Sequence, residues 1–156
     1  MNTWSYVFPE ISRDATAFAY NRPGYGQSES AATPRDGMHV VDELRALLRS
    51  KGLTPPYILV GHSLGGLYMQ LFARRYPDEV AALILVDSSH PMQFRGKGSL
   101  GNWPAWARLI FGVASTPTQK EELDAVNATG DAILALPPPT GKPVIVLSAG
   151  REVDTR

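Results

Sequence analysis

One local pattern leaves few folds open to this chain: an apolar run followed by a glycine-bounded turn and then a helix. The run is Tyr57-Ile58-Leu59-Val60, which is made of residues that favour strands. It leads directly into Gly61-His62-Ser63-Leu64-Gly65. Beyond the turn, Leu67, Leu71 and Phe72 recur at helical spacing. The sequence therefore predicts a strand, a very sharp turn at Ser63 and a helix in direct succession.

The chemistry of this turn follows from its shape. Side chains at Gly61 and Gly65 are expected to clash with neighbouring elements, which explains a glycine on each side of Ser63. The turn would lift the serine hydroxyl above the sheet, and the start of the following helix favours negative charge there. We expect Ser63 to be a nucleophile and the Leu64 N–H to be an oxyanion donor. A buried structural serine in a glycine-rich turn is the alternative.

The rest of the chain predicts an α/β fold. Further strands are expected at 15–20, 82–86 and 143–147, and helices at 4–11, 36–50 and 119–136. Strands that alternate with helices are typical of parallel βαβ units. Because the strands are apolar without alternation, we expect a mostly parallel sheet with helices on both faces.

Composition restricts the classes of partner. The 156 residues suffice for one domain, and 15 basic residues balance 15 acidic ones, so no net field favours nucleic acid. Cysteine is absent, and no apolar run approaches the roughly 20 residues of a membrane span. No signal peptide, metal motif or nucleotide motif is found. We expect a cytoplasmic protein with a small-molecule partner, no cofactor, no metal, no nucleic acid and no membrane span.

Two further motifs carry a resemblance to a known family. Asn21-Arg22-Pro23-Gly24-Tyr25-Gly26-Gln27-Ser28 is similar to a D-R-P-G-x-G-x-S loop, and Arg75-Tyr76-Pro77-Asp78-Glu79-Val80 to an R-Y-P-x-x-V link. Together with the turn at Ser63, they make the chain resemble the α/β-hydrolase superfamily, in particular serine esterases and lipases. The resemblance implies hydrolysis of carboxylic esters through an acyl-enzyme on Ser63. It also implies a partial hydrolase core at 1–90 and 143–156 and a cap or lid insertion at 91–142.

The chain departs from the family pattern at both ends. Members carry a His-Gly oxyanion loop before the position of residue 4, and a catalytic histidine after a final strand; this sequence contains neither. We therefore expect it to represent the central part of a hydrolase, with strands that lack neighbours and could mediate self-association. A non-catalytic remnant that acts as a binding module is the alternative.

None of the three histidines is expected to replace the missing base. His39 lies near the start of a surface helix, and His62 precedes Ser63 on a turn that points its side chain elsewhere. His90 follows the neighbouring strand at the edge where Ser63 is exposed, so a substitute base there is conceivable, although a simple loop histidine is the preferred interpretation.

The remaining candidates are an acid and two aromatic residues. The resemblance places the acid after the strand at 143–147, which favours Asp154 with Glu152 beside it; Asp87 is the alternative. Trp103 and Trp106 could line a pocket for an apolar group, but packing against the core is the favoured interpretation.

Overall fold

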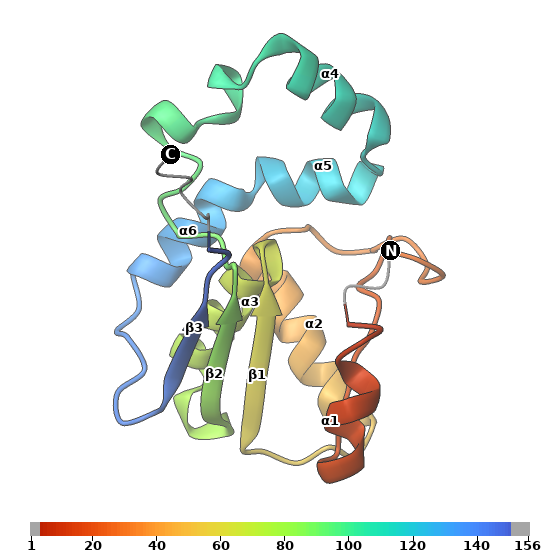
Figure 1. Ribbon diagram of the computed structural model, residues 1–156, viewed down its shortest axis with the longest axis vertical. Coiled ribbons are helices and arrows are strands. Elements are labelled where there is room, and N and C mark those ends of the chain that lie inside the picture. The colour runs from red at the N-terminus through yellow and green to blue at the C-terminus, as the bar shows by residue number, and fades with distance from the viewer. Residues whose placement is uncertain (1–3, 151–156) are drawn as a thin grey trace, which may run out of the picture.

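The computed structural model describes residues 4–150 as a three-stranded sheet with helices packed behind it (Figure 1). Its α-helices are α1 (Phe8–Asp14), α2 (Gly37–Ser50), α3 (Leu64–Arg75), α4 (Ala105–Ala114), α5 (Pro117–Asp124) and α6 (Val126–Leu134). Its strands are β1 (Tyr57–His62), β2 (Val80–Val86) and β3 (Val144–Leu147). Short 3-10 helices are η1 (Pro77–Glu79), η2 (Gly96–Gly98) and η3 (Leu100–Asn102).

The sheet is parallel throughout, in the order β1-β2-β3. Val60 of β1 is opposite Ile84 of β2, which is in turn opposite Ile145 of β3. Parallel neighbours need long crossovers, and here α3 connects β1 to β2, while α4, α5 and α6 lie between β2 and β3. The predicted α/β class is confirmed. β1 and β3 are the edge strands, so each has one side without a strand partner. Self-association through these unpaired strands stays a prediction.

The hydrophobic core lies between one face of the sheet and three helices. α3 packs against β1 and β2, and α2 and α6 pack against α3. Its centre is formed by side chains that are almost fully buried: Val40, Val41, Leu59, Leu67, Leu71, Phe72, Leu83, Val126 and Ile133. Each such aliphatic or aromatic side chain contributes about 1.5–3 kcal/mol on burial. This packing fixes the start of α3, and with it the turn at Ser63.

The opposite face of the sheet is open. Ile58 is 64% exposed and Val60 is 38% exposed, and every residue of β3 is exposed. Burial alternates along β1, because Leu59 and Gly61 face α3 while their neighbours face away. The sequence also predicted helices on this second face, but no helix within residues 4–150 buries these side chains.

Two predicted elements differ from the structure. The run at 15–20 is not a strand: it has no regular secondary structure and belongs to no sheet, because no neighbouring strand in the described range accepts its backbone hydrogen bonds. The helix expected at 4–11 lies at Phe8–Asp14, with Pro9 in its first turn. Proline is tolerated there because the first N–H groups of a helix have no intrahelical acceptor, so Pro9 begins this helix instead of interrupting it.

The segment 91–142 contains more helix than expected. The predicted helix at 119–136 is split into α5 and α6, which meet at Ala125, and α4 was not predicted. α6 contributes Val126 and Ile133 to the core, whereas α4 has no buried residue. Figure 1 shows α5 and α4 beyond the carboxyl ends of the strands, which is the edge where ligands bind in open α/β sheets.

Candidate active site

Ser63 is the single residue between β1, which ends at His62, and α3, which begins at Leu64. Its backbone has φ 52° and ψ −125°, a conformation that L-residues rarely adopt. Such strain costs on the order of 1–3 kcal/mol and persists only where the surrounding structure imposes it. The predicted strand, sharp turn and helix are therefore present, with Ser63 at the corner.

Close packing around this corner requires glycine at two positions, Gly61 and Gly66, and the sequence predicted only Gly61. A Cβ at Gly61 would lie 2.7 Å from the carbonyl oxygen of Gly65, so the predicted clash there is confirmed. A Cβ at Gly65 would meet nothing within 4 Å, so the predicted clash at that position is wrong. Gly66 is the second tight position, because its Cβ would lie 2.0 Å from Ser88 Oγ in the loop after β2. Gly65, the second residue of α3, has free space around it, whereas Gly66, the third residue, packs against the loop after β2.

The backbone of Ser63 is fixed from two sides while its side chain is left exposed. Its N–H donates to the Val86 carbonyl over 3.2 Å. Its carbonyl accepts from the N–H groups of Gly66 and Ser89, at 2.9 and 3.1 Å. The residue as a whole is exposed, and its hydroxyl makes no hydrogen bond to another residue of the range 4–150. The hydroxyl is thus held at the carboxyl edge of the sheet and available to solvent.

Leu64 occupies the first position of α3. Its N–H belongs to the four donors at a helix start that have no intrahelical acceptor. The partial positive charge of the helix N-terminus lies at the same point, and the first turn of α3 contains no acidic residue to offset it. The role of Leu64 as an oxyanion donor stays a prediction, with a geometry that suits it.

Asp87 is the second strained residue of this edge. It follows β2 as Ser63 follows β1, because His62 and Val86 are paired in the sheet, and it has φ 42°. Within residues 4–150 these two are the only non-glycine residues with positive φ. The Asp87 N–H donates to the Leu147 carbonyl over 2.7 Å, and the residue is exposed. Backbone outliers of this kind cluster at functional sites.

The preferred acid, Asp154, and its neighbour Glu152 lie outside the described residues, so their roles stay predictions. Asp87 is therefore the alternative acid that the structure describes, and it lies at the same sheet edge as Ser63.

The three histidines have other partners or point elsewhere. His39 Nδ1 lies 2.6 Å from Asp36 Oδ2, and the Asp36 carboxylate caps the start of α2. Burial raises the pKa of Asp36, but the hydrogen bonds from His39 outweigh it and lower that pKa overall. His90 Nδ1 accepts the Met92 N–H over 3.1 Å, which holds the ring within its own turn. Neither these two nor the exposed His62 hydrogen-bonds to Ser63.

Comparison with known proteins identifies the family to which this fold belongs. Residues 1–143 match the family described as the alpha/beta hydrolase fold. The chain belongs to this family.

Among the relatives of this hydrolase-fold chain is the human (lyso)-N-acylphosphatidylethanolamine lipase, 32% identical over 114 residues, with 70% of the chain and 33% of the lipase covered. The backbone is similar to that of a carboxylesterase from the thaumarchaeon Nitrososphaera gargenis, with a TM-score of 0.63 at 17% identity over 93% of this chain and 66% of the other. A marine microorganism esterase gives 0.59 at 20% identity, covering 85% and 53%. Because both of these structures are only 17–20% identical to the chain, the two similarities show a shared fold and nothing more.

The hydrolase-fold chain is short beside these relatives. It spans between 14% and 34% of the length of the curated proteins that it matches first. Within residues 4–150 no three His, Cys, Asp or Glu side chains lie close enough together to hold a metal ion. None of the described helices combines the length and hydrophobicity that crossing a bilayer requires.

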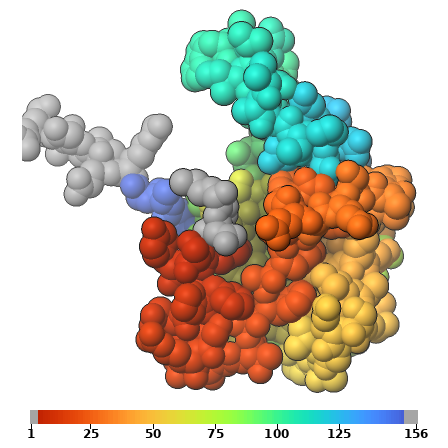
Figure 2. Space-filling model, turned by 90° about the vertical axis from the view of Figure 1, so that its right-hand side faces the viewer, coloured from red at the N-terminus to blue at the C-terminus, as the bar shows by residue number. Residues whose placement is uncertain are grey.

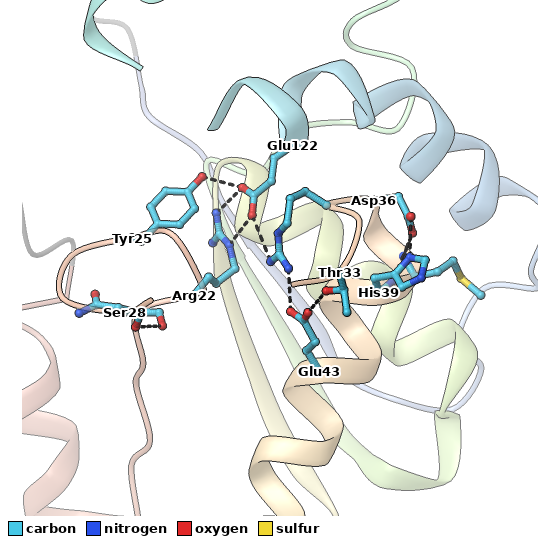
Figure 3. Close-up of polar contacts among 11 residues, drawn as sticks. Arg22, Tyr25, Ser28, Thr33, Asp36, His39, Glu43 and Glu122 are labelled. Carbon is cyan, nitrogen blue, oxygen red and sulfur yellow. Dashed lines mark hydrogen bonds and ion pairs between the residues drawn. The ribbon is translucent and has the colours of Figure 1, made fainter. Parts of the chain in front are cut away.

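A buried ion network was not predicted from the sequence (Figure 3). Glu122 of α5 is fully buried, and its carboxylate accepts hydrogen bonds from Arg22 Nε at 3.1 Å, Arg22 Nη2 at 2.7 Å and the Tyr25 hydroxyl at 2.6 Å. The buried Arg35 lies 3.6 Å away and also pairs with Glu43 at 2.8 Å. The network joins the family-like loop around Arg22 to the segment beyond the strand ends. In the sequence Glu122 is one of four acidic residues in the polar helix predicted at 119–136, so nothing distinguishes it from a solvated side chain.

Burial sets the protonation of the phenols around this network. It raises the pKa of Tyr25 to about 12, with the hydrogen bond to Glu122 acting in the same direction. It raises the pKa of Tyr20 to about 12 and that of Tyr68 further still. Burial alone would lower the pKa of Arg22, but the hydrogen bond to Glu122 raises it overall. At neutral pH Tyr25 therefore stays a donor to Glu122, and Arg22 stays a cation.

The two tryptophans occupy different environments. Trp103 lines a cavity of about 250 Å³ beneath α4, together with Phe111 and Leu123, and its ring meets Phe111 edge to face at 6.0 Å between centroids. Trp106 is 67% exposed and does not line this cavity. Neither tryptophan belongs to the hydrophobic core or to the side chains packed against it, so the favoured prediction is wrong for both, and Trp103 instead lines a cavity.

Proposed function

We propose that this hydrolase-fold chain carries the nucleophile of a serine hydrolase that cleaves carboxylic esters through an acyl-enzyme on Ser63. The observation that carries the proposal is the strained corner at Ser63, which costs stability and holds an exposed hydroxyl at the sheet edge. A structural serine would not need φ 52°. The human relative called a lipase and the structural neighbours called esterases support an ester substrate of small-molecule size.

In the proposed reaction, Ser63 Oγ attacks the ester carbonyl and a new Oγ–C bond forms. The negative charge that develops on the carbonyl oxygen is accepted by the Leu64 N–H at the start of α3. The C–O bond to the alcohol then breaks, and the alcohol leaves with the proton taken from Ser63. Water attacks the acyl-enzyme, releases the acid and restores the hydroxyl. The family pattern assigns the proton transfers to a histidine, oriented by Asp154 or by Asp87.

We propose that the segment 91–142 covers this site as a cap. Its α4 and α5 lie beyond the carboxyl ends of the strands (Figure 1), and Glu122 anchors α5 to the loop around Arg22 and Tyr25. The loop after β2 is tied to the corner as well, since the Ser89 N–H donates to the Ser63 carbonyl. One contact thus anchors α5 to the loop around Arg22, and another anchors the loop after β2 to the corner at Ser63.

The test is covalent labelling by a fluorophosphonate probe, which reacts with activated serines. We expect labelling of the folded chain that is slow, because none of the described histidines hydrogen-bonds to Ser63. This labelling should disappear in Ser63→Ala and persist in Ser50→Ala, a change at an exposed serine on α2. Circular dichroism of each variant shows that the fold is retained. If the folded chain is not labelled, the alternative of a non-catalytic remnant that acts as a binding module is favoured.

A further inference from the structure

The loop after β2, residues 87–89, contacts the Ser63 corner from outside the strand and helix that form it. The Ser63 N–H donates to the carbonyl of Val86, the last residue of β2, at 3.2 Å. The Ser63 carbonyl accepts the N–H of Ser89 at 3.1 Å, and Ser89 is buried. A strained backbone persists only where its surroundings impose it, so the position of this loop helps to set the position of the Ser63 hydroxyl.

Gln70 of α3 fixes the loop after β2 with its side chain. Its Nε2 donates to Ser88 Oγ at 3.2 Å and to the Ser89 carbonyl at 3.4 Å. In the described part of the chain, no other side chain from outside the loop forms a hydrogen bond to it. Gln70 lies one turn after Gly66 on the same face of α3. Gly66 lets the loop approach this closely, because a Cβ there would lie 2.0 Å from Ser88 Oγ.

The hydrogen bonds within the loop require a donor with two hydrogens at position 70. The Ser88 hydroxyl donates to the Ser89 carbonyl at 3.1 Å, so its oxygen is left as an acceptor for any further partner. The Ser89 carbonyl is an acceptor as well. Gln70 therefore faces two acceptors with its NH2 group, whose two hydrogens suffice for both. An apolar side chain of the same length could bind neither.

This contact is separate from the one that anchors the cap. Figure 2 shows the cyan residues of α5 resting on the orange loop around Arg22, where Glu122 pairs with the Arg22 guanidinium. The contacts that connect Gln70 to Ser63 involve only α3 and the loop after β2. A change at Gln70 should therefore alter the corner without releasing α5.

We infer that Gln70 is a positioning residue for the nucleophile: through Ser88 and Ser89 it holds the Ser63 carbonyl, and with it the hydroxyl, in the orientation for attack. The inference rests on the proposed role of Ser63 and adds a residue that acts without touching the substrate. Small displacements of a reacting atom lower reaction rates strongly. Loss of the Gln70 contacts therefore slows the reaction at Ser63 in a chain that is still folded.

The variant that tests the inference is Gln70→Met, which keeps the length of the side chain and removes both N–H donors. We expect the maximal rate of fluorophosphonate labelling at Ser63 to fall by about 5-fold or more, the rate equivalent of one neutral hydrogen bond. The probe concentration that gives half the maximal rate should stay within about 2-fold, because Gln70 acts on Ser63 and not on the bound probe. Circular dichroism shows that the variant is folded under the labelling conditions.

Arg74→Met is the matched control for a purely structural loss. Arg74 lies one turn further along α3, and its Nη1 donates to the Leu136 carbonyl at 2.8 Å. This variant also loses a hydrogen bond from α3 to a backbone carbonyl, but it leaves the loop after β2 unchanged. It should lower the melting temperature without slowing the labelling. Equal slowing in both variants would show that labelling follows general stability, and would overturn the inference.

Amide hydrogen exchange tests the same contact without any reaction. Exchange of the Ser89 N–H should become about 5-fold or more faster in Gln70→Met and stay unchanged in Arg74→Met. Slower labelling with unchanged exchange at Ser89 would overturn the inference, because the effect would not pass through Ser89.

The labelling rates separate failure of the inference from failure of the proposed function. If the unchanged chain is labelled at Ser63 and Gln70→Met is labelled at the same rate, the inference is overturned and the hydrolase proposal stands. If the folded, unchanged chain is not labelled at all, the hydrolase proposal is overturned and the inference with it.

Discussion

The guanidinium of Arg22 and the carboxylate of Glu122, 100 residues apart in the chain, form a two-pronged ion pair with N–O distances of 3.1 and 2.7 Å. The Arg22 guanidinium also lies over the rings of Tyr25 and Tyr68, at 4.4 and 5.2 Å from their centroids. The cation is thus enclosed by a carboxylate and two aromatic rings, of which Figure 3 shows that of Tyr25. This relationship holds α5 to the loop before α2.

Glu122→Gln is predicted to destabilise the fold by about 3 kcal/mol, because it leaves a buried guanidinium without its counter-charge. Urea unfolding followed by circular dichroism measures the change. Glu121→Gln removes the same charge from the neighbouring exposed position and should stay within about 0.5 kcal/mol of the unchanged chain. Similar midpoints for the two variants would mean that the pair adds nothing to stability.

Gly61→Ala and Gly65→Ala form a matched pair with opposite expected outcomes. The Cβ at position 61 would meet the Gly65 carbonyl at 2.7 Å, and relief of that clash must move backbone, so we expect a loss of about 1–3 kcal/mol. The Cβ at position 65 meets nothing within 4 Å and lies in a helix, where alanine is preferred to glycine by up to about 1 kcal/mol. Thermal melts of the two variants test the order; Gly65→Ala melting below Gly61→Ala would contradict it.

Ser63→Gly is predicted to raise stability. Glycine adopts the backbone conformation at φ 52° and ψ −125° without the Cβ strain that serine bears. We expect the free energy of unfolding to increase by about 1 kcal/mol relative to Ser63→Ala, which keeps the strain and lacks the hydroxyl. Both variants should lose probe labelling. A glycine variant no more stable than the alanine variant would show that the corner is relaxed.

Glu79 is predicted to make stability depend on pH in the acid range. Hydrogen bonds from Arg45 at 2.6–3.0 Å lower its pKa below the ordinary 4.5, against a smaller opposing effect of burial. A carboxyl whose folded pKa is lowered contributes stability above its unfolded pKa and loses that contribution as the pH falls through the folded value. Glu79→Gln should therefore cost about 1 kcal/mol at pH 7 and progressively less below pH about 4.5. The control, Asp78→Asn at the exposed neighbour, should show no such convergence in urea titrations at several pH values.

The elements that sequence reasoning located correctly are those fixed by local interactions. The corner at Ser63 needs glycine at position 61 and an apolar strand before it, and both requirements appear within a few residues of each other. The helix expected at 36–50 follows from its periodic apolar residues, and the structure places it at Gly37–Ser50 with Asp36 as its cap. Both can be read from the sequence because neither depends on a distant partner.

The elements it missed depend on distant partners. The run at 15–20 has strand-like composition, yet a strand exists only if a neighbour completes its hydrogen bonds. Glu122 looks like a surface residue until Arg22 is brought to it from the far end of the sequence. The helix α4 was not predicted, and periodicity would in any case indicate an apolar face without showing whether another element covers it.

The hydrogen bond from the Asp87 N–H to the Leu147 carbonyl makes β3 a support for the sheet edge that carries Ser63. β3 is the most weakly covered strand of the sheet, with all four residues exposed, and Leu147 is its terminal residue. Fraying of that end would release Asp87 from its left-handed conformation, next to the position that Ser63 occupies on the adjoining strand. Deuterium uptake at Asp87 would then report the opening of β3, and any molecule that pairs with this strand would also restrain the sheet edge beside Ser63.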